Sequence, residues 1–317
     1  MGASGGATDT TGHTPVLYQQ VLSALQPSAG ARYIDGTIGA GGHASGILEA
    51  SAPDGQLLGL DRDPSAVALA SHRLKTFGER AVIRQGSFAE MVTLAASIGW
   101  QAVQGVLLDL GLSSMQLKDA SRGFSFHVEG PLDMRFDAGQ PLSAADLVNG
   151  LPEGDLADLL ARYGEEPRAR QVAKAIIEAR PLHTTLALAE VVADVAGRVR
   201  KGMHPATRTF QALRIAVNDE LKALEAGLEQ AVSLLDPGGR LAVIAFHSLE
   251  DRIVKRFIRQ ESQDCICPPE RLVCTCGHRA RLRTHTRRPI RPDEREVHAN
   301  PRARSARLRV AERLEVA

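Results

Sequence analysis

A glycine-rich segment that begins with an acidic residue is the part of the chain best suited to bind a ligand. It reads Asp35-Gly-Thr-Ile-Gly-Ala-Gly-Gly-His43 and lies between an expected strand and an expected helix. Glycines at such a turn let a ligand approach the backbone, and the N-terminus of the following helix attracts a carboxylate or phosphate. Asp61 ends the next expected strand, where a carboxylate can accept hydrogen bonds from a ribose diol. The pattern predicts a cofactor that contains a nucleoside.

Two kinds of cofactor fit this pattern. Gly39-Ala-Gly-Gly-His-Ala44 satisfies the GxGxxA fingerprint of dinucleotide-binding enzymes, which is a weak signal when it stands alone. Asp35 would repel a pyrophosphate but would attract the sulfonium and ammonium groups of S-adenosylmethionine. Asp109, at the end of a fourth expected strand, adds another carboxylate. Either Asp could instead cap a turn or a helix, but together they favour S-adenosylmethionine.

All four cysteines fall in two CxC pairs, Cys265-Ile-Cys267 and Cys274-Thr-Cys276. Four thiolates can bind zinc, although this spacing is tighter than the usual CxxC and two prolines lie between the pairs. Free thiols in a reducing compartment and a redox-labile loop are the alternatives. We assign no metal to the predicted active site and do not expect catalysis to depend on these cysteines.

The acidic residues need a sheet to bring them together, and the first part of the chain predicts one. Four apolar runs alternate with helical patterns, at residues 32–35, 56–61, 81–84 and 103–109. Strands that alternate with helices form parallel, doubly wound sheets. Three of the runs end in Asp, so carboxylates are expected at the C-terminal edge of the sheet, where such folds bind ligands. A short helix that starts at Thr14 and Pro15 is expected before the first strand.

A helical pattern interrupts this alternation. The expected helices cover residues 142–147, 155–163, 169–179, 186–195 and 207–235. The predicted fold is therefore α/β, with a sheet domain formed by residues 13–116 and 219–317 and an inserted all-helical domain at 117–218.

The strand pattern resumes at residues 240–246 and is followed by a helix from Ser248, where Ser248-Leu-Glu-Asp251 matches a capping box. The last strands are expected at 281–286 and 304–310.

The composition is that of an ordinary globular protein without a membrane anchor. Of the 317 residues, 44% are hydrophobic and 24% are charged, and no apolar run approaches the roughly 18 to 20 residues that span a bilayer. Residues 1–12 are small and polar and lack the regions of a signal peptide, so they predict a flexible leader. The expected location is the cytoplasm.

The charge balance changes sign near Arg252. From this residue onward there are 17 Lys and Arg against 8 Asp and Glu, whereas the preceding residues hold 21 against 29. A basic segment suggests a polyanionic partner, because each neutralised phosphate releases a counterion. The alternative is a solvated basic surface. Arg208 and Arg214 are further candidates for phosphate contacts.

A series of motifs extends over nearly the whole chain. They read His13-Thr-Pro-Val-Leu17, Asp35-Gly-Thr-Ile-Gly-Ala-Gly-Gly-His43, Asp61-Arg-Asp-Pro64, Asp109-Leu-Gly-Leu-Ser-Ser-Met-Gln116, Arg122-Gly-Phe-Ser-Phe126, Pro131-Leu-Asp-Met-Arg135, His204-Pro-Ala-Thr-Arg-Thr-Phe-Gln211, Phe246-His-Ser-Leu-Glu-Asp-Arg252 and Asn300-Pro-Arg-Ala-Arg-Ser305. In this order they closely resemble the RsmH (MraW) family of 16S ribosomal RNA (cytosine-N4)-methyltransferases.

The resemblance implies a class I, Rossmann-like methyltransferase domain with an inserted helical domain that recognises RNA. It implies S-adenosylmethionine-dependent methylation of a cytidine in the decoding region of small-subunit rRNA, within the ribosomal subunit. The cofactor-binding residues that it implies are Gly41, Gly42 and His43 at the methionine part, Asp61 at the ribose, Phe88 near the adenine, and Asp109 and Gln116. From sequence alone, Phe88 could equally be a core aromatic and Gln116 a surface loop residue.

Methylation at N4 needs help from the protein, because the lone pair of this nitrogen is delocalised into the cytosine ring. The site must hold the amino hydrogens and accept a proton as the bond forms. The candidates are Asp109, Ser113 and His247, whose imidazole suits proton transfer at neutral pH. His247 could instead make a structural hydrogen bond with Ser248 or Glu250.

The loop after Asp109 departs from the pattern of other amino-methyltransferases. Those enzymes carry an Asp/Asn-Pro-Pro-aromatic motif here, whereas this chain has Asp109-Leu-Gly-Leu and then Ser113 and Ser114. The aromatic that would stack on the base is therefore missing. Phe124 and Phe126 are candidate substitutes, with burial between the domains as the alternative.

Two other functions remain open on the residues alone. One is an oxidoreductase that binds a dinucleotide through Gly39, Gly41 and Asp61. The other is a non-catalytic RNA-binding factor that uses the basic segment and a zinc knuckle, although the chain has no RNP1 signature.

Overall fold

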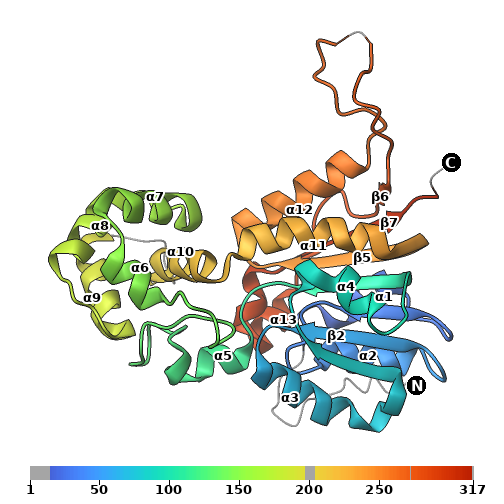
Figure 1. The fold of residues 1–317 in the computed structure, drawn as a ribbon, viewed down its shortest axis with the longest axis horizontal. Coiled ribbons are helices and arrows are strands. Elements are labelled where there is room, and N and C mark those ends of the chain that lie inside the picture. The colour runs from blue at the N-terminus through green and yellow to red at the C-terminus, as the bar shows by residue number, and fades with distance from the viewer. Residues whose placement is uncertain (1–14, 197–203, 272, 316–317) are drawn as a thin grey trace. The chain divides into compact units, whose positions relative to one another are not determined.

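The computed structural model describes residues 15–196, 204–271 and 273–315 (Figure 1). The expected leader, residues 1–12, and the expected helix start at Thr14 lie outside the described residues. Within the described ranges, no helix is long and apolar enough to cross a membrane. The chain divides into two compact units, which are residues 1–111 with 223–317 and residues 112–222.

One sheet organises the first unit, with its strands in the order β3-β2-β1-β4-β5-β7-β6. Neighbouring strands from β3 to β5 are parallel, and β7 is antiparallel to both β5 and β6. The strands are β1 (Arg32–Asp35), β2 (Gln56–Asp61), β3 (Ala81–Gln85), β4 (Val103–Asp109), β5 (Leu235–Ala245), β6 (Leu282–Thr284) and β7 (Arg307–Arg313). The arrangement confirms the predicted α/β fold with a mostly parallel, doubly wound sheet.

Helices pack on both faces of this sheet (Figure 1). They are α1 (Tyr18–Leu25), α2 (Gly42–Ala50), α3 (Pro64–Arg73), α4 (Met91–Ala96), α11 (Glu220–Leu234) and α12 (Ser248–Glu261). The same unit also contains α13 (Glu294–Ala299) and 3-10 helices at Leu74–Arg80, Phe88–Glu90 and Pro301–Ser305. Alternate strand residues face opposite sides of the sheet. Ile34 and Leu108 therefore join one apolar core with α4, α11 and α12, whereas Tyr33 and Leu107 join another with α1, α2 and α3.

The strand order reverses at β1, which lies between β2 and β4. Open α/β sheets bind ligands beyond the C-terminal ends of the strands at such a switch point. Both β1 and β4 end in an acidic residue there, Asp35 and Asp109. The fold thus gathers carboxylates where it is best suited to hold a ligand.

The second unit is helical. Its helices are α5 (Ser114–Lys118), α6 (Ala144–Gly150), α7 (Glu153–Gly164), α8 (Ala169–Glu178), α9 (Thr185–Ala196) and α10 (Thr207–Asn218), with a 3-10 helix at Ala120–Arg122. Leu160, Val172, Ile176 and Leu213 are fully buried and belong to an apolar core that includes residues of α6 to α10.

Three predictions for the helices are wrong. The opening helix begins at Tyr18 instead of Pro15, because Leu17 has a left-handed backbone with φ of 54°. The single helix expected at 207–235 is two helices, because Asp219, with φ of 51°, ends α10 before α11 begins. The capping box of α12 consists of His247 and Glu250, one residue earlier than the box predicted from Ser248.

Two strand boundaries also differ from the prediction. The last strand starts at Arg307 instead of residue 304, because Pro301–Ser305 forms a 3-10 helix. The strand expected at 240–246 extends back to Leu235, which pairs with Val103 before an irregularity shifts the register.

Candidate active site

Three aspartates lie at the C-terminal ends of the neighbouring strands β2, β1 and β4. Asp35 is 1% exposed, and its Oδ1 accepts hydrogen bonds from the Thr37 backbone N–H at 3.1 Å and from the Thr37 hydroxyl at 3.4 Å. The same hydroxyl oxygen accepts a hydrogen bond of 2.6 Å from the backbone N–H of Asp109. Thr37, which the sequence did not single out, therefore links the ends of β1 and β4.

These aspartates are held in surroundings that disfavour their charge. Burial raises the pKa of Asp35 to about 7, and the nearby charge of Asp61 adds to the effect. Burial also raises the pKa of Asp61, and the pKa of Asp109 is raised first by burial and then by Asp35 and Glu250. Among the described residues, no Lys or Arg forms an ion pair with any of the three aspartates. A cationic ligand would relieve this repulsion, so the site fits the sulfonium and ammonium of S-adenosylmethionine.

Asp61 ties the glycine-rich turn to β2. Its Oδ2 accepts a hydrogen bond of 3.0 Å from the Gly39 N–H, and its Oδ1 accepts one of 2.9 Å from the Asp63 N–H. Gly39 and Gly41 have φ of 50° and 78°, a region that favours glycine. Each carboxylate oxygen can accept more than one hydrogen bond, so Asp61 keeps acceptor capacity for a ribose diol.

A glycine at position 42 lets the N-terminal segment, which begins at Pro15 in the described structure, pack closely against the glycine-rich turn. A Cβ on Gly42 would lie 2.5 Å from Cγ of Pro15. The segment is fixed by Leu17, which is fully buried and whose N–H donates a hydrogen bond of 2.6 Å to Glu296 Oε1 of α13. Of the His13 motif, His13 and Thr14 lie outside the described residues. The glycine turn therefore packs directly under this segment.

His43 lies in the first turn of α2 and is 5% exposed. Its Nε2 is 3.7 Å from Oδ2 of Asp109. Within the described residues, neither ring nitrogen of His43 nor Oδ1 of Asp109 makes a hydrogen bond of good geometry, although the backbone of Val16 lies close enough to the imidazole to favour its protonated form slightly. Burial lowers the pKa of His43 to about 4, so its ring is neutral at pH 7. Buried polar atoms are nearly always satisfied, so these orphaned atoms mark a place for a polar ligand.

Phe88 begins a 3-10 helix and packs partly against the apolar core. Its neighbours include two glycines, because a Cβ on Gly36 would lie 2.8 Å from Phe88 Cβ and one on Gly227 would lie 2.4 Å from Phe88 Cδ2. The side chain is therefore half-buried beside the residue that follows Asp35. It combines a core contact with a position next to the glycine-rich turn.

Ser113 and Gln116 belong to the helical unit and cap α5. Gln116 Oε1 accepts a hydrogen bond of 3.0 Å from the Ser113 N–H, and Ser113 Oγ accepts one of 3.2 Å from the Gln116 N–H. Gln116 is 7% exposed, so it is buried instead of lying on a surface loop. Ser113 and Gln116 have the S-x-x-Q spacing of a capping box, so this role could have been predicted from the sequence.

His247 is the N-cap of α12. Its Nδ1 accepts a hydrogen bond of 3.3 Å from the Glu250 N–H, and its Nε2 lies 3.1 Å from Glu250 Oε1. Glu250 Oε2 in turn accepts hydrogen bonds from the N–H groups of Phe246 and His247. The structural alternative expected for His247, a bond with Glu250, is therefore the one observed.

Phe124 and Phe126 pack inside the helical unit. Phe124 is 4% exposed and stacks on Phe136, with ring centroids 5.6 Å apart. Phe126 stacks on His204 at 4.7 Å and meets Phe210 edge-on. Phe124 is thus a core residue of this unit.

The arginines divide into paired and unpaired groups. Arg214 makes a bidentate ion pair with Glu220, at 2.7 and 2.9 Å. Its guanidinium group is therefore engaged within the protein, which favours a structural role over the predicted phosphate contact. In the basic segment, Arg307 and Arg309 bind Asp251, and Arg281 binds Glu229 and Glu261. Exposed arginines without an ion pair among the described residues of this segment include Arg287, Arg288, Arg291, Arg295, Arg302 and Arg304.

This chain is similar to known proteins over most of its length. The sequence profile of the MraW methylase family matches residues 10–314. A protein of Thermomicrobium roseum named ribosomal RNA small subunit methyltransferase H is 56% identical over 308 residues, 96% of this chain and 94% of that protein. A protein of the same name from Geobacter sulfurreducens is 53% identical over 310 residues, 96% of this chain and 100% of that protein.

A solved structure of an rRNA methylase from Streptococcus thermophilus aligns over 94% of each chain at 10% identity, with a TM-score of 0.41. The family profile spans nearly the whole sequence. The chain therefore belongs to the MraW methylase family, with S-adenosylmethionine as its cofactor.

Proposed function

We propose that this chain methylates the N4 amino group of a cytidine in the decoding region of small-subunit ribosomal RNA. The observation that carries the proposal is Asp109, a carboxylate at the end of β4 with one buried oxygen that has no partner among the described residues. The relatives from Thermomicrobium roseum and Geobacter sulfurreducens, named as small-subunit rRNA methyltransferases, support the choice of RNA.

Seven residues are the proposed cofactor-binding residues. They are Gly41, Gly42, His43, Asp61, Phe88, Asp109 and Gln116. When bound, the cofactor supplies a methyl group activated by a sulfonium that is also a good leaving group. The turn at Gly41 and Gly42 would admit the methionine part, and Asp61 would accept hydrogen bonds from the ribose hydroxyls. The position of His43 directly after Gly42, in the first turn of α2, supports its place beside the methionine part.

Asp109 is the proposed proton acceptor for the amino group. Its carboxylate, whose side chain is 25% exposed, would accept a hydrogen bond from N4, turn the lone pair out of conjugation and take a proton as the nitrogen is methylated. A raised pKa makes this carboxylate a better base than an exposed Asp, because a base works best when its pKa approaches the working pH. A cation bound nearby would keep it ionised until the proton is transferred.

Ser113 and His247 receive no proton in this proposal. The Ser113 hydroxyl caps α5 and the His247 Nδ1 caps α12, so each is already engaged with a backbone N–H. They are positioning residues for the ends of their helices.

RNA recognition is assigned to the helical unit together with the basic segment. Arginine suits this task, because its planar fork binds phosphates and stacks on bases. The exposed and unpaired arginines between Arg287 and Arg304 support phosphate contacts. The assembled small ribosomal subunit is the proposed substrate.

The test is methyl transfer from labelled S-adenosylmethionine to small ribosomal subunits that lack the modification, followed by nucleoside analysis. We expect the label in N4-methylated cytidine of the decoding region, with more transfer to subunits than to naked rRNA. As a control, subunits with uridine at the target position should accept no label. Label on a ring carbon, on a ribose or in large-subunit rRNA would contradict the proposal.

A further inference from the structure

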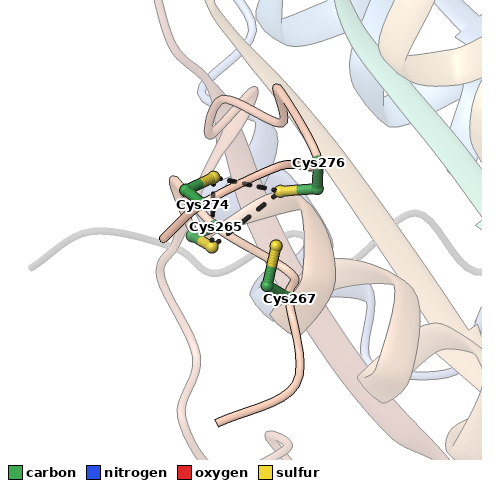
Figure 2. A group of neighbouring side chains, drawn as sticks. All are labelled: Cys265, Cys267, Cys274 and Cys276. Atoms are coloured by element: carbon green, nitrogen blue, oxygen red, sulfur yellow. Dashed lines mark hydrogen bonds between the residues drawn. The ribbon is translucent and has the colours of Figure 1, made fainter. Parts of the chain in front are cut away.

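We propose that Cys265, Cys267, Cys274 and Cys276 form a structural zinc site that orders the loop between α12 and β6. Their sulfur atoms all lie within 4.8 Å of one another, and the four side chains converge in Figure 2. The proposal stands apart from the proposed function, because it concerns none of the residues assigned to cofactor or base.

The sulfur–sulfur distances among Cys265, Cys274 and Cys276 match one face of the tetrahedron around a single ion, and the Cys267 sulfur lies within 4.8 Å of all three. The three distances are 3.5 Å for Cys265 and Cys274, 3.6 Å for Cys274 and Cys276, and 3.8 Å for Cys265 and Cys276. A zinc–sulfur bond of about 2.3 Å in a regular tetrahedron gives a sulfur–sulfur edge of about 3.8 Å. All four cysteines are free thiols, and these distances far exceed the roughly 2.05 Å of a disulfide bond.

The backbone around the sulfurs is arranged to stabilise thiolates. The Ile266 N–H donates to Cys276 Sγ at 3.5 Å, and the Thr275 N–H donates to Cys267 Sγ at 3.4 Å. Each CxC pair thus donates a backbone N–H to a sulfur of the other pair. Gly277, with φ of 62°, turns the chain immediately after the last cysteine. Such hydrogen bonds to metal-bound ligands fix their orientation and tune their charge.

Besides the sulfurs, a few polar contacts hold the described part of the loop, such as the hydrogen bond from the Ala280 N–H to Asp264 Oδ1. Among its described residues, from 262 to 281, there is no helix or strand, and it projects from the end of α12 in Figure 1. Its apolar side chains are exposed, with Ile266 at 41% and Val273 at 73%. A long loop without an apolar core is uncommon in an ordered domain. Binding of a metal can supply the missing free energy, as it does in small zinc-dependent folds.

Zinc is the ion that fits best. Four thiolates in a tetrahedron select zinc or iron, and a cluster of several irons would spread the sulfurs farther apart because the four thiolates are divided among different irons. With four protein ligands the site has no open position, which is the mark of a structural and not a catalytic zinc.

The test is metal analysis of the full chain purified under reducing conditions with zinc in the medium. We expect one zinc per chain, and X-ray absorption at the zinc edge should show four sulfur ligands at about 2.3 Å. Cys276→Ser should lose the zinc, whereas Val273→Ser, in the same loop and without a role at the sulfurs, should keep it. A reduced wild-type chain without zinc, or with bound iron instead, would overturn the proposal.

A second measurement keeps the proposal testable if Cys276→Ser folds poorly. Trypsin should cut the wild-type loop after Arg271 and Arg279 several-fold faster once a chelator removes the metal, and added zinc should restore protection. Mass spectrometry of the same samples should show four free thiols after chelation. Two disulfides in the purified chain, or cleavage that zinc does not change, would count against a metal site.

Discussion

His43 Nε2 lies 3.7 Å from Asp109 Oδ2, which joins the first turn of α2 to the end of β4. The pair is not a salt bridge at neutral pH, because burial lowers the pKa of the imidazole to about 4 while the pKa of the carboxyl is raised. Both side chains keep buried polar atoms without partners among the described residues. Such an arrangement costs stability in the free protein and is favourable only when a ligand completes it.

Asp109→Asn tests the role of this carboxylate as a base. The amide keeps the size of the side chain but cannot accept a proton, so kcat for methyl transfer should fall roughly 10²- to 10⁴-fold. Affinity for S-adenosylmethionine should fall less, by about tenfold or below. Steady-state kinetics on small subunits and equilibrium binding of the cofactor would separate the two effects. Asp54→Asn, an exposed carboxylate in the same unit, serves as the control. An Asp109→Asn enzyme with nearly normal kcat would rule out the proposed base.

Cofactor affinity should rise with pH through the pKa of Asp35. This pKa is raised to about 7 by burial, so the carboxyl becomes charged, and attracts a cation, as the pH passes from 6 to 8. Titration calorimetry with S-adenosylmethionine across this range would measure the effect. S-adenosylhomocysteine keeps the amino group but lacks the sulfonium charge, so its affinity should depend on pH more weakly. Equal pH dependence for the two ligands would mean that Asp35 does not act on the sulfonium.

The same carboxyl should make the cofactor-free protein less stable at high pH. The pKa of Asp35 in the folded protein, about 7, lies above the usual 3.8. The folded protein therefore gains stability from the neutral carboxyl, which is fully present below pH 3.8 and is lost as the pH rises through 7. Asp35→Asn removes the titration and should therefore stabilise the free protein at pH 8, by an amount on the order of 2–4 kcal/mol, but not at pH 4. Denaturant unfolding at the two pH values would show it. A variant destabilised at pH 8 would contradict the account.

Much of this architecture could be predicted from local sequence. β1, β2 and β4 begin and end at the predicted residues, because each is a short apolar run closed by an Asp. Their order places these acids at one edge, which is a consequence of the parallel fold and needs no knowledge of individual contacts. The glycine-rich turn was predictable for the same reason, since its pattern is local.

The errors arose where a residue acts against its usual preference. Asp219 breaks the helix expected at 207–235 with a left-handed φ, although no glycine or proline marks the position. His247 caps α12, although Ser, Thr, Asp and Asn are the usual caps. The bond from the Leu17 N–H to Glu296 joins residues 279 apart in sequence, and no local pattern predicts such a contact.

Gly42→Ala tests whether that N-terminal contact supports the site. The new Cβ would lie 2.5 Å from Pro15 Cγ, and Pro15 has little freedom to move because Leu17, two residues on, is buried and bonded to Glu296. The variant should lose about 1–3 kcal/mol of stability, since overpacking forces the neighbouring backbone to shift. Cofactor affinity should fall as well, because a shift of the backbone at Gly42 would also displace His43, the next of the proposed cofactor-binding residues.

Gly154→Ala provides the matched control for this substitution. A Cβ at Gly154 of α7 meets nothing within 4 Å, so this change should leave cofactor affinity intact and stabilise the helix by about 0.5–1 kcal/mol. Thermal unfolding and cofactor binding on both variants would give the comparison. If Gly42→Ala behaved like Gly154→Ala, the contact between Pro15 and Gly42 would have no part in positioning the glycine-rich turn.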